Sequence, residues 1–201
     1  MAPRGHSADD VARTALRILD DHGLPDLTMR RLATALEVQP SALYWHFPNK
    51  QTLLAELSDR IVSRMASGTA VDLRTEAGAL REALLTYRDS AEVVSSTLAL
   101  GLGSSLAHDR LTAAVAADGF DADTARRSAT TVLHYVLGFV WHEQQRLHYD
   151  SVGVREESAG AALHDAGEDG VADIGAAGLA SDDFAFGLEL ITAGLQARRR
   201  V

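Results

Sequence analysis

Apolar residues recur at helical spacing along most of the chain, and the first such stripe begins at residue 8. Ser7 and Asp10 resemble a capping box at its start, in which each side chain bonds the backbone of the other residue. Gly23 follows His22 at its end, where a residue that tolerates a positive φ commonly stands. These signals predict a first helix whose buried face consists of Ala8, Val11, Ala12, Ala15, Leu16 and Leu19.

Two shorter helical stretches follow, and together they are typical of a helix-turn-helix. Thr28 can cap the first of them. The connection Glu37-Val38-Gln39 lacks the glycine that such turns often contain. Pro40 suits the first turn of the next helix, because that position needs no backbone N–H. In the first short helix we expect the side chains of Leu32, Ala33 and Leu36 to face the core. The side chains of Arg30 and Arg31 then remain free at the surface.

The second short helix carries Tyr44, Trp45 and His46 next to each other. Consecutive helical residues point about 100° apart, so one packing face cannot bury all three. At least one large aromatic side chain and the imidazole must therefore be exposed, and we expect them to enter a DNA groove. The alternative is that Trp45 packs in the small core of this region, which still leaves Tyr44 and His46 at the surface.

Longer helices are expected after this region. Asn49 can cap a long fourth helix, whose apolar face is Leu53, Leu54, Leu57, Ile61, Val62 and Met65. Further helices are expected at about 75–88, 90–101, 105–117, 123–148 and 182–199. Residues 150–183 are rich in Gly, Ala and acid, which predicts a flexible loop with one short helix near 156–163.

The expected fold class is therefore all-α. Residues 1–50 form an N-terminal three-helix head with the helix-turn-helix, and the long fourth helix joins this head to a helical body, residues 51–201. The composition agrees, because 46% of the residues are hydrophobic and only four are proline. The chain has no cysteine, which excludes disulfides and thiolate zinc sites. It has no apolar run long enough for a signal peptide or a membrane helix, so we expect a soluble, cytoplasmic protein without membrane contact.

Charge is distributed unevenly between head and body. The net charge of −9 argues against nucleic-acid binding by the chain as a whole. Residues 1–50, however, hold six Lys or Arg against six Asp or Glu, whereas the later residues hold 13 bases against 22 acids. A neutral head on an acidic body is compatible with DNA binding by the head alone.

Several stretches of the sequence match a known family in the same order. In the head they are Leu27–Ala33, Leu43–His46 and Asn49-Lys50, and in the body they are Tyr87–Asp89, His134–Gly138, Glu143–Gln145 and Ala185–Glu189. On these residues the chain resembles the TetR family of bacterial repressors, and within it the tetracycline-repressor branch. The resemblance implies an all-helical homodimer, in which two heads read a palindromic DNA operator and each body binds a small effector.

Carried over residue by residue, the resemblance also implies the DNA contacts. Arg30 matches an arginine that such repressors direct at a base. The base-reading positions are Pro40, Ser41 and Ala42, and the positions that mainly grip the phosphate backbone are Tyr44, Trp45, His46 and Lys50. Pro40-Ser41-Ala42 replaces a glutamine-proline-threonine run, so it has little capacity for paired hydrogen bonds to a base. The operator should therefore differ, with methyl contacts from Pro40 or Ala42 to thymine, or a base contact from Gln39.

The effector positions depart from the tetracycline branch. Val94 stands where that branch has a histidine that helps to hold drug-bound magnesium, and only Thr97 keeps its type. The other positions read Ala66, Glu76 and Leu80 in place of histidine, asparagine and phenylalanine, and among them Glu76 is able to substitute as a metal ligand. We expect no magnesium–tetracycline chelate and no other metal or cofactor, but an apolar or aromatic effector. Its candidate lining residues are Met65, Leu80, Leu84, Val94, Thr97, Leu98, His134, Leu137 and Trp141.

Some of these residues also have a purely structural interpretation. Met65 and Trp141 fit a helical core, and His134 fits a subunit interface. The apolar helices near 123–148 and 182–199 suit packing within one chain, and they equally suit a dimeric four-helix bundle. The resemblance favours the second arrangement, so we expect a homodimer through these two helices.

Two other functions are weighed against a ligand-responsive repressor. A helical small-molecule-binding enzyme is one: His142 and His148 superficially resemble a zinc-protease motif, but that motif needs two histidines four residues apart on one helix face. Position 146 is Arg, so we expect no enzyme. A constitutive DNA-binding protein of the same fold is the other, and it would call for a basic body without a cavity. The acidic body and the 150–183 segment favour a sensor instead.

Overall fold

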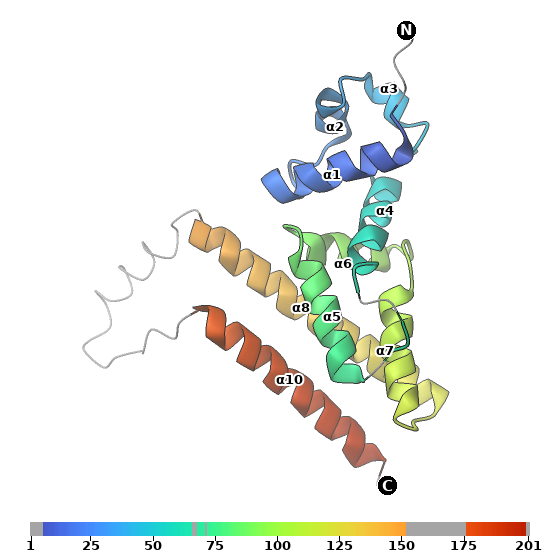
Figure 1. Cartoon of the computed structure of the whole chain (residues 1–201), viewed down its shortest axis with the longest axis vertical. Coiled ribbons are helices and arrows are strands. Elements are labelled where there is room, and N and C mark those ends of the chain that lie inside the picture. The colour runs from blue at the N-terminus through green and yellow to red at the C-terminus, as the bar shows by residue number, and fades with distance from the viewer. Residues whose placement is uncertain (1–5, 66–67, 71, 152–175, 200–201) are drawn as a thin grey trace, which may run out of the picture. The chain divides into compact units, whose positions relative to one another are not determined.

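The structure is a computed structural model that describes residues 6–65, 68–70, 72–151 and 176–199. Within these ranges every regular element is a helix (Figure 1). The helices are α1 (Ala8–His22), α2 (Met29–Ala35), α3 (Pro40–Leu43), α4 (Lys50–Val62), α5 (Leu73–Leu85), α6 (Ser90–Ala99), α7 (Leu106–Ala117), α8 (Ala122–Ser151) and α10 (Ala176–Arg198). They form two compact units, Met1–Trp141 and His142–Val201, whose boundary lies within α8. The expected all-α class is confirmed, and none of these helices is long and apolar enough to cross a membrane.

The first helix begins and ends where the sequence predicts. The Ser7 hydroxyl accepts the Asp10 N–H at 3.1 Å, and the Asp10 carboxylate accepts the Ser7 N–H at 2.9 Å, which completes the capping box. Hydrogen bonds from the Ser7 side chain and backbone, with a further one from Arg13, lower the pKa of Asp10 to about 2. Gly23 ends α1 with a φ of 82°, a conformation that residues with a side chain rarely adopt.

The turn between α2 and α3 contains a non-glycine residue in a left-handed conformation. Thr28 caps α2 by accepting the Arg31 N–H at 3.1 Å, and Pro40 is the first residue of α3, both as expected. Between the helices, Glu37 has a φ of 56°, where glycine is favoured because it has no Cβ. Glu37 thus adopts the left-handed conformation that a glycine commonly provides in such turns.

We expect Glu37→Gly to stabilise the protein by about 1 kcal/mol, because glycine adopts this conformation without the steric cost of a Cβ. Urea unfolding at a fixed protein concentration measures the gain. Glu37→Ala is the matched control, because it removes the same charge but keeps the Cβ, and it should give no such gain. Equal stabilisation by both variants would show that the charge, and not the backbone, is responsible.

Helix α3 is shorter than expected. It ends at Leu43, so Tyr44, Trp45 and His46 lie in the turn that follows and not on a continued helix. The Leu43 carbonyl accepts the Phe47 N–H, four residues on, at 2.9 Å, and also the His46 N–H, only three residues on, at 3.0 Å, so the chain tightens here and regular α-helix ends. Pro48 comes next and cannot continue a helix, because it lacks an N–H and disfavours helical geometry in the residue before it.

Helix α4 is also shorter than expected. Asn49 caps it by accepting the Thr52 N–H at 2.9 Å, as predicted. It ends at Val62 after 13 residues, so Met65 is not on its apolar face but lies buried in the following turn. There the N–H groups of Arg64 and Met65 bond carbonyls only three residues back, which ends the α-helical pattern. Helix α4 packs against α1 and against α5 and α6, so it still connects the head helices with the body helices (Figure 1).

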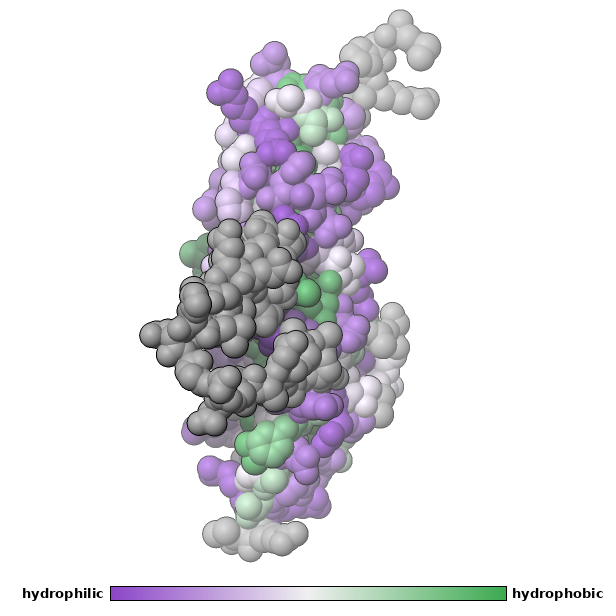
Figure 2. Space-filling model, turned by 90° about the vertical axis from the view of Figure 1, so that its left-hand side faces the viewer, coloured by the Kyte–Doolittle hydropathy of each residue, from purple (hydrophilic) through white to green (hydrophobic). Residues whose placement is uncertain are grey.

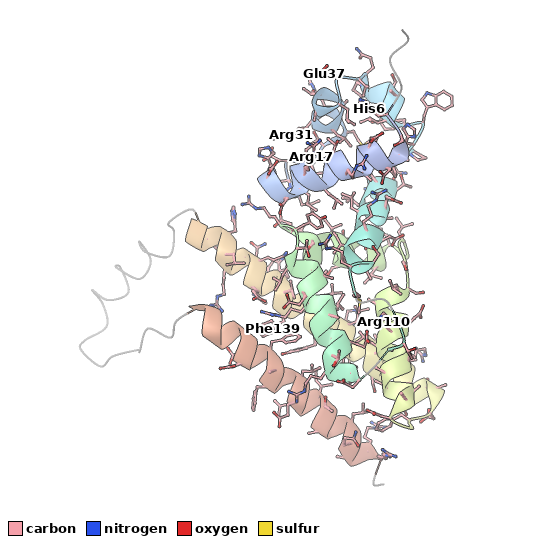
Figure 3. All side chains as sticks on the ribbon, viewed as in Figure 1. His6, Arg17, Arg31, Glu37, Arg110 and Phe139 are labelled. Carbon is pink, nitrogen blue, oxygen red and sulfur yellow. The ribbon has the colours of Figure 1, made fainter. Side chains whose placement is uncertain are left out.

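A buried ion pair joins two body helices. Glu76 on α5 is 1% exposed and accepts two hydrogen bonds from the guanidinium of Arg110 on α7, at 2.7 Å from Nε and 2.9 Å from Nη2. The Nη1 atom of Arg110 donates to the Gly68 carbonyl at 2.9 Å (Figure 3 labels Arg110). Paired and hydrogen-bonded charges of this kind are tolerated in an interior, whereas a single buried charge is not.

The second unit contains the end of α8 and the whole of α10, and both helices extend into the predicted loop. Helix α10 spans Ala176–Arg198 and α8 ends at Ser151, so residues 150–151 and 176–181 are helical where only a loop was expected. Alanine and leucine near the start of α10 have high helix propensity, which the overall Gly and acid content obscured. The remainder of the predicted loop, with its short helix near 156–163, lies outside the described residues. Helical spacing in the sequence predicts an apolar face of Phe184, Leu188, Ile191 and Leu195 for α10; Phe184, Leu188 and Leu195 are buried and Ile191 is half-buried.

Candidate nucleic-acid interface

The residues around α3 form one exposed surface held by two buried anchors. The exposed residues, which we call the recognition surface, are Gln39, Pro40, Ser41, Ala42, Tyr44, Trp45 and His46. Leu43 and Phe47, which interrupt and follow them, are 1% and 6% exposed. The Phe47 N–H bonds the Leu43 carbonyl at 2.9 Å, so the two anchors are one turn apart and both enter the core of the head. Every other side chain of the segment is left available to a partner.

Trp45 lies at the surface and not in the core. Its side chain is 90% exposed, and its neighbour Tyr44 is 49% exposed. The alternative in which Trp45 packs in the head is therefore wrong, and Phe47 fills that role. Spacing was the signal that could have identified Phe47, because it follows the inward-facing Leu43 by one helical turn. The hydroxyl of Tyr44 and the imidazole of His46 are both exposed, and groups of these types commonly bond phosphate oxygens when a protein fixes its register on DNA.

The cations of the head differ in how they are paired. Arg30 is exposed, and among the described residues it makes no ion pair. Arg31, the next residue on α2, bonds the Asp26 carboxylate at 2.7 Å (Figure 3 labels Arg31). Lys50 is half-buried at the first position of α4. On the face shown in Figure 2, the surface of the α1–α3 group is predominantly hydrophilic. Arg30 is thus the arginine of α2 whose charge is available to DNA.

The candidate effector residues come from several packed helices. Helix α6 packs against α4 and α5, and most of the candidates on these elements are buried: Met65, Leu80, Leu84, Val94 and Thr97. Leu98 is half-buried. On α8, Leu137 is buried, whereas His134 is exposed and Trp141 is 39% exposed. The structure therefore brings the α5 and α6 candidates into one apolar region, and it leaves His134 and Trp141 on more open parts of α8.

Helix α6 is hydrogen-bonded at both ends to elements that carry the head. At its start, the Asp89 carboxylate accepts the Leu24 N–H from the α1–α2 turn at 2.8 Å. Gly23 permits this approach, because a Cβ there would lie 2.8 Å from the Asp89 oxygen. After its end, the Ser104 N–H donates to the Asp59 carboxylate of α4 at 2.5 Å. In the sequence, Asp89 stands out only as part of a stretch that matches the family, and Asp59 has no predicted role.

Helix α4 is in turn joined to the head by an ion pair. Arg60 on α4 bonds Asp9 of α1 and Glu56 of its own helix, each at 2.7 Å. Burial acts to lower the pKa of Arg60, but the bonds to Asp9 and Glu56 outweigh it and raise the pKa above its usual value. The guanidinium therefore stays charged at any physiological pH. Because it bonds Asp9, a displacement of α4 strains or breaks a contact with α1.

Glu76 is not available as a metal ligand, although its residue type allowed that role. Both of its carboxylate oxygens accept hydrogen bonds from Arg110. A cation at this position would have to displace a guanidinium from a site where Glu76 is fully buried. The one carboxylate that could replace the missing histidine ligand is thus already neutralised within the protein.

Known proteins match both parts of the chain. Residues 12–57 match the family described as bacterial regulatory proteins, tetR family, and residues 68–199 match the tetracyclin repressor-like C-terminal domain. The class E tetracycline repressor of Escherichia coli is 35% identical over 146 residues, 69% of this chain and 69% of that protein. BioQ of Mycobacterium smegmatis is 39% identical with a TM-score of 0.78, over 96% of this chain and 98% of BioQ. A structure of BioQ with its natural double-stranded DNA operator is 36% identical with a TM-score of 0.73, over 94% of this chain and 98% of that one.

Proposed function

Because this chain belongs to the TetR family of DNA-binding transcriptional regulators, we propose that it is a repressor which a small, largely apolar or aromatic effector releases from its operator. The observation that carries this proposal is α6, a helix with buried candidate effector residues that is hydrogen-bonded at both ends to head-bearing elements. In this proposal residues 1–50 are the DNA-binding domain, and residues 51–201 bind the effector and form the dimer.

The head binds DNA through the recognition surface, with Arg30 and Lys50 beside it. Regulators of this family bind double-stranded operators as dimers. We expect this chain to do so through the helices near 123–148 and 182–199, and to act in the cytoplasm, where operator DNA lies. Two heads about 34–36 Å apart fit successive major grooves of a palindrome. Joining them matters, because a single head with few cations neutralises few phosphates and binds weakly.

The proposed effector class follows from the charges and the apolar residues of the body. Val94 supplies no imidazole for a metal, and Glu76 is held by Arg110. The buried candidates on α5 and α6 are aliphatic except for Thr97, whose hydroxyl bonds backbone carbonyls of its own helix at 2.9 and 3.1 Å. Such a lining favours a ligand held mainly by apolar contact. The magnesium ion of a tetracycline chelate would instead find few protein ligands here.

Release of the operator follows from how α6 is held. A ligand that displaces α6 pulls on the α1–α2 turn through Asp89 and on α4 through Asp59. Both elements position the recognition surface, so the separation of the two heads changes and no longer matches successive major grooves. The ligand acts only through its different affinities for the two arrangements.

The test begins with selection of an operator from random duplexes by the purified protein. Fluorescence anisotropy on that operator then compares 1-naphthol and 4-phenylphenol, two uncharged aromatic probes, with tetracycline plus Mg²⁺. We expect operator binding to weaken with an aromatic probe and not with the chelate. Release by magnesium and tetracycline would refute the proposed effector class. Operator binding that no probe changes would favour the constitutive DNA-binding alternative.

Removing the hydrogen bond between Asp89 and the Leu24 N–H should make operator affinity largely independent of effector binding. Asp89→Gly deletes the carboxylate that accepts the Leu24 N–H, and glycine suits the φ of 55° at this position, so no backbone strain is added. We expect operator affinity within about tenfold of wild type, but little further loss when the effector binds. Asp89→Asn is the matched control, because its amide oxygen still accepts the bond. Full release in Asp89→Gly would show that α4 alone transmits the displacement.

A further inference from the structure

A groove beside α1 contains none of the candidate effector residues. It has a volume of about 560 Å³, within the range of about 300–1,000 Å³ that small-molecule sites commonly occupy. Helix α1 forms one wall, the end of α2 contributes Ala35 and Leu36, and Tyr87 from the α5–α6 turn adds an aromatic ring. The groove therefore joins a head helix to a residue of the body within one compact unit.

The charged residues of this groove are not equally engaged. Asp10 and Arg13 are bonded to each other, and Arg13 also pairs with Asp9 at 3.0 Å. Arg17 has only the Thr14 hydroxyl, at 3.1 Å, and it makes no ion pair among the described residues (Figure 3 labels Arg17 on α1). Asp20 accepts the Arg88 N–H at a long 3.3 Å and likewise has no cationic partner in the described part of the chain.

One cation and one anion thus line the same groove without pairing. Arg17 and Asp20 are three residues apart on α1, which puts them on the same helix face with Cβ atoms about 5–6 Å apart. Between the walls, the buried Leu16 and Leu36 and the ring of Tyr87 provide an apolar surface. A complementary ligand carries a carboxylate, an ammonium and a small apolar group.

We propose that this groove binds a free amino acid with an apolar or aromatic side chain and acts as a second, co-effector site. Arg17 receives the carboxylate, Asp20 receives the ammonium, and the side chain lies against Leu16, Leu36 and Tyr87. Paired charge-assisted hydrogen bonds of this kind are stronger than neutral ones. Because the ligand contacts both α1 and Tyr87, it favours one arrangement of head and body and shifts operator affinity. Binding itself does not depend on the effector proposed for the body.

Three probes with the same phenyl group separate the two charges. Isothermal titration calorimetry of the DNA-free full chain compares L-phenylalanine with 3-phenylpropionate, which lacks the ammonium, and 2-phenylethylamine, which lacks the carboxylate. We expect saturable binding of L-phenylalanine and at least about tenfold weaker binding of the other two. Equal binding of all three, or no saturable binding of L-phenylalanine, would overturn the proposal.

Variants then assign each charge to its residue. Arg17→Gln should weaken L-phenylalanine binding by at least about tenfold and leave 2-phenylethylamine binding unchanged, and Arg17→Lys should restore part of the loss. Asp20→Asn should weaken L-phenylalanine binding similarly, while its amide oxygen still accepts the Arg88 N–H. Arg126→Gln, which removes another exposed arginine, here from α8, is the control and should bind like wild type. Wild-type affinity in both groove variants would place the ligand elsewhere.

The co-effector role has its own readout. Operator anisotropy with and without saturating L-phenylalanine should differ in wild type and not in Arg17→Gln. An operator affinity that L-phenylalanine leaves unchanged would overturn the co-effector role. If calorimetry shows no binding of L-phenylalanine, the groove is not a binding site. If aromatic probes fail to release the operator, only the effector site proposed in the body is refuted.

Discussion

Replacing Arg30 with alanine should weaken operator binding by a factor of about 30 or more. A paired hydrogen bond from an arginine to a base contributes about 1–3 kcal/mol, and a dimer loses one such contact in each head. Arg30 is exposed on α2 and makes no ion pair in the described part of the chain, so its charge is free to act on DNA. Fluorescence anisotropy on the selected operator measures the loss, and a set of operators with single base changes should show reduced discrimination at one position in each half-site.

The adjacent arginine is a matched control for that experiment. Arg31 lies on the same helix but is paired with Asp26 at 2.7 Å. Exposed pairs of this kind contribute at most about 1 kcal/mol, so Arg31→Ala should reduce operator affinity by less than about tenfold and leave base discrimination intact. Melting temperatures should be similar for both variants. The assignment fails if Arg31→Ala costs as much affinity as Arg30→Ala.

The largest loss of stability is expected for Arg110→Met. The variant leaves the carboxylate of Glu76 buried at 1% exposure without its two charge-assisted hydrogen bonds. Breaking a buried pair in this way typically costs about 3–5 kcal/mol, a large part of the stability of an ordinary domain. Urea unfolding measures it, and protein concentration must be held constant because dimerisation contributes to the apparent stability.

A double variant distinguishes the missing partner from the missing volume. Glu76→Leu combined with Arg110→Met removes both charges and fills the space with apolar atoms, so it should recover most of the loss. If the double variant is as unstable as Arg110→Met alone, packing of the arginine stem is responsible. A cost below about 1 kcal/mol for Arg110→Met would contradict the buried ion pair altogether.

Local signals in the sequence predicted most helix starts correctly. Ser7, Thr28 and Asn49 each cap the expected helix, because a side chain that accepts a nearby N–H acts within three residues and needs no tertiary information. Helix ends were harder. Helices α3 and α4 stop at Leu43 and Val62, where the backbone changes from α to tighter hydrogen bonding, and apolar spacing continues past both points.

The candidate site was predictable only in part. From the sequence, at least one large aromatic side chain and the imidazole had to be exposed, because one helix face cannot bury three consecutive residues. Tyr44, Trp45 and His46 are all exposed, although they lie in a turn and not on the expected helix. The contacts at Asp89 and Asp59 were not predictable, because each joins residues 45 or 65 positions apart and depends on how helices pack. The pairing of Glu76 with Arg110 was missed for the same reason, and it changes the interpretation of the effector region.

The way the recognition surface is anchored has an evolutionary consequence. Leu43 and Phe47 alone secure the segment in the core, whereas its other side chains contribute little to folding. If these residues read bases as proposed, substitutions at Gln39, Ser41 or Ala42 change the preferred operator at almost no penalty in stability. Such a segment can acquire a new operator by a few mutations, each of which leaves a folded protein for selection to act on. The departure at Pro40-Ser41-Ala42 from the tetracycline branch is the kind of change that this architecture makes accessible.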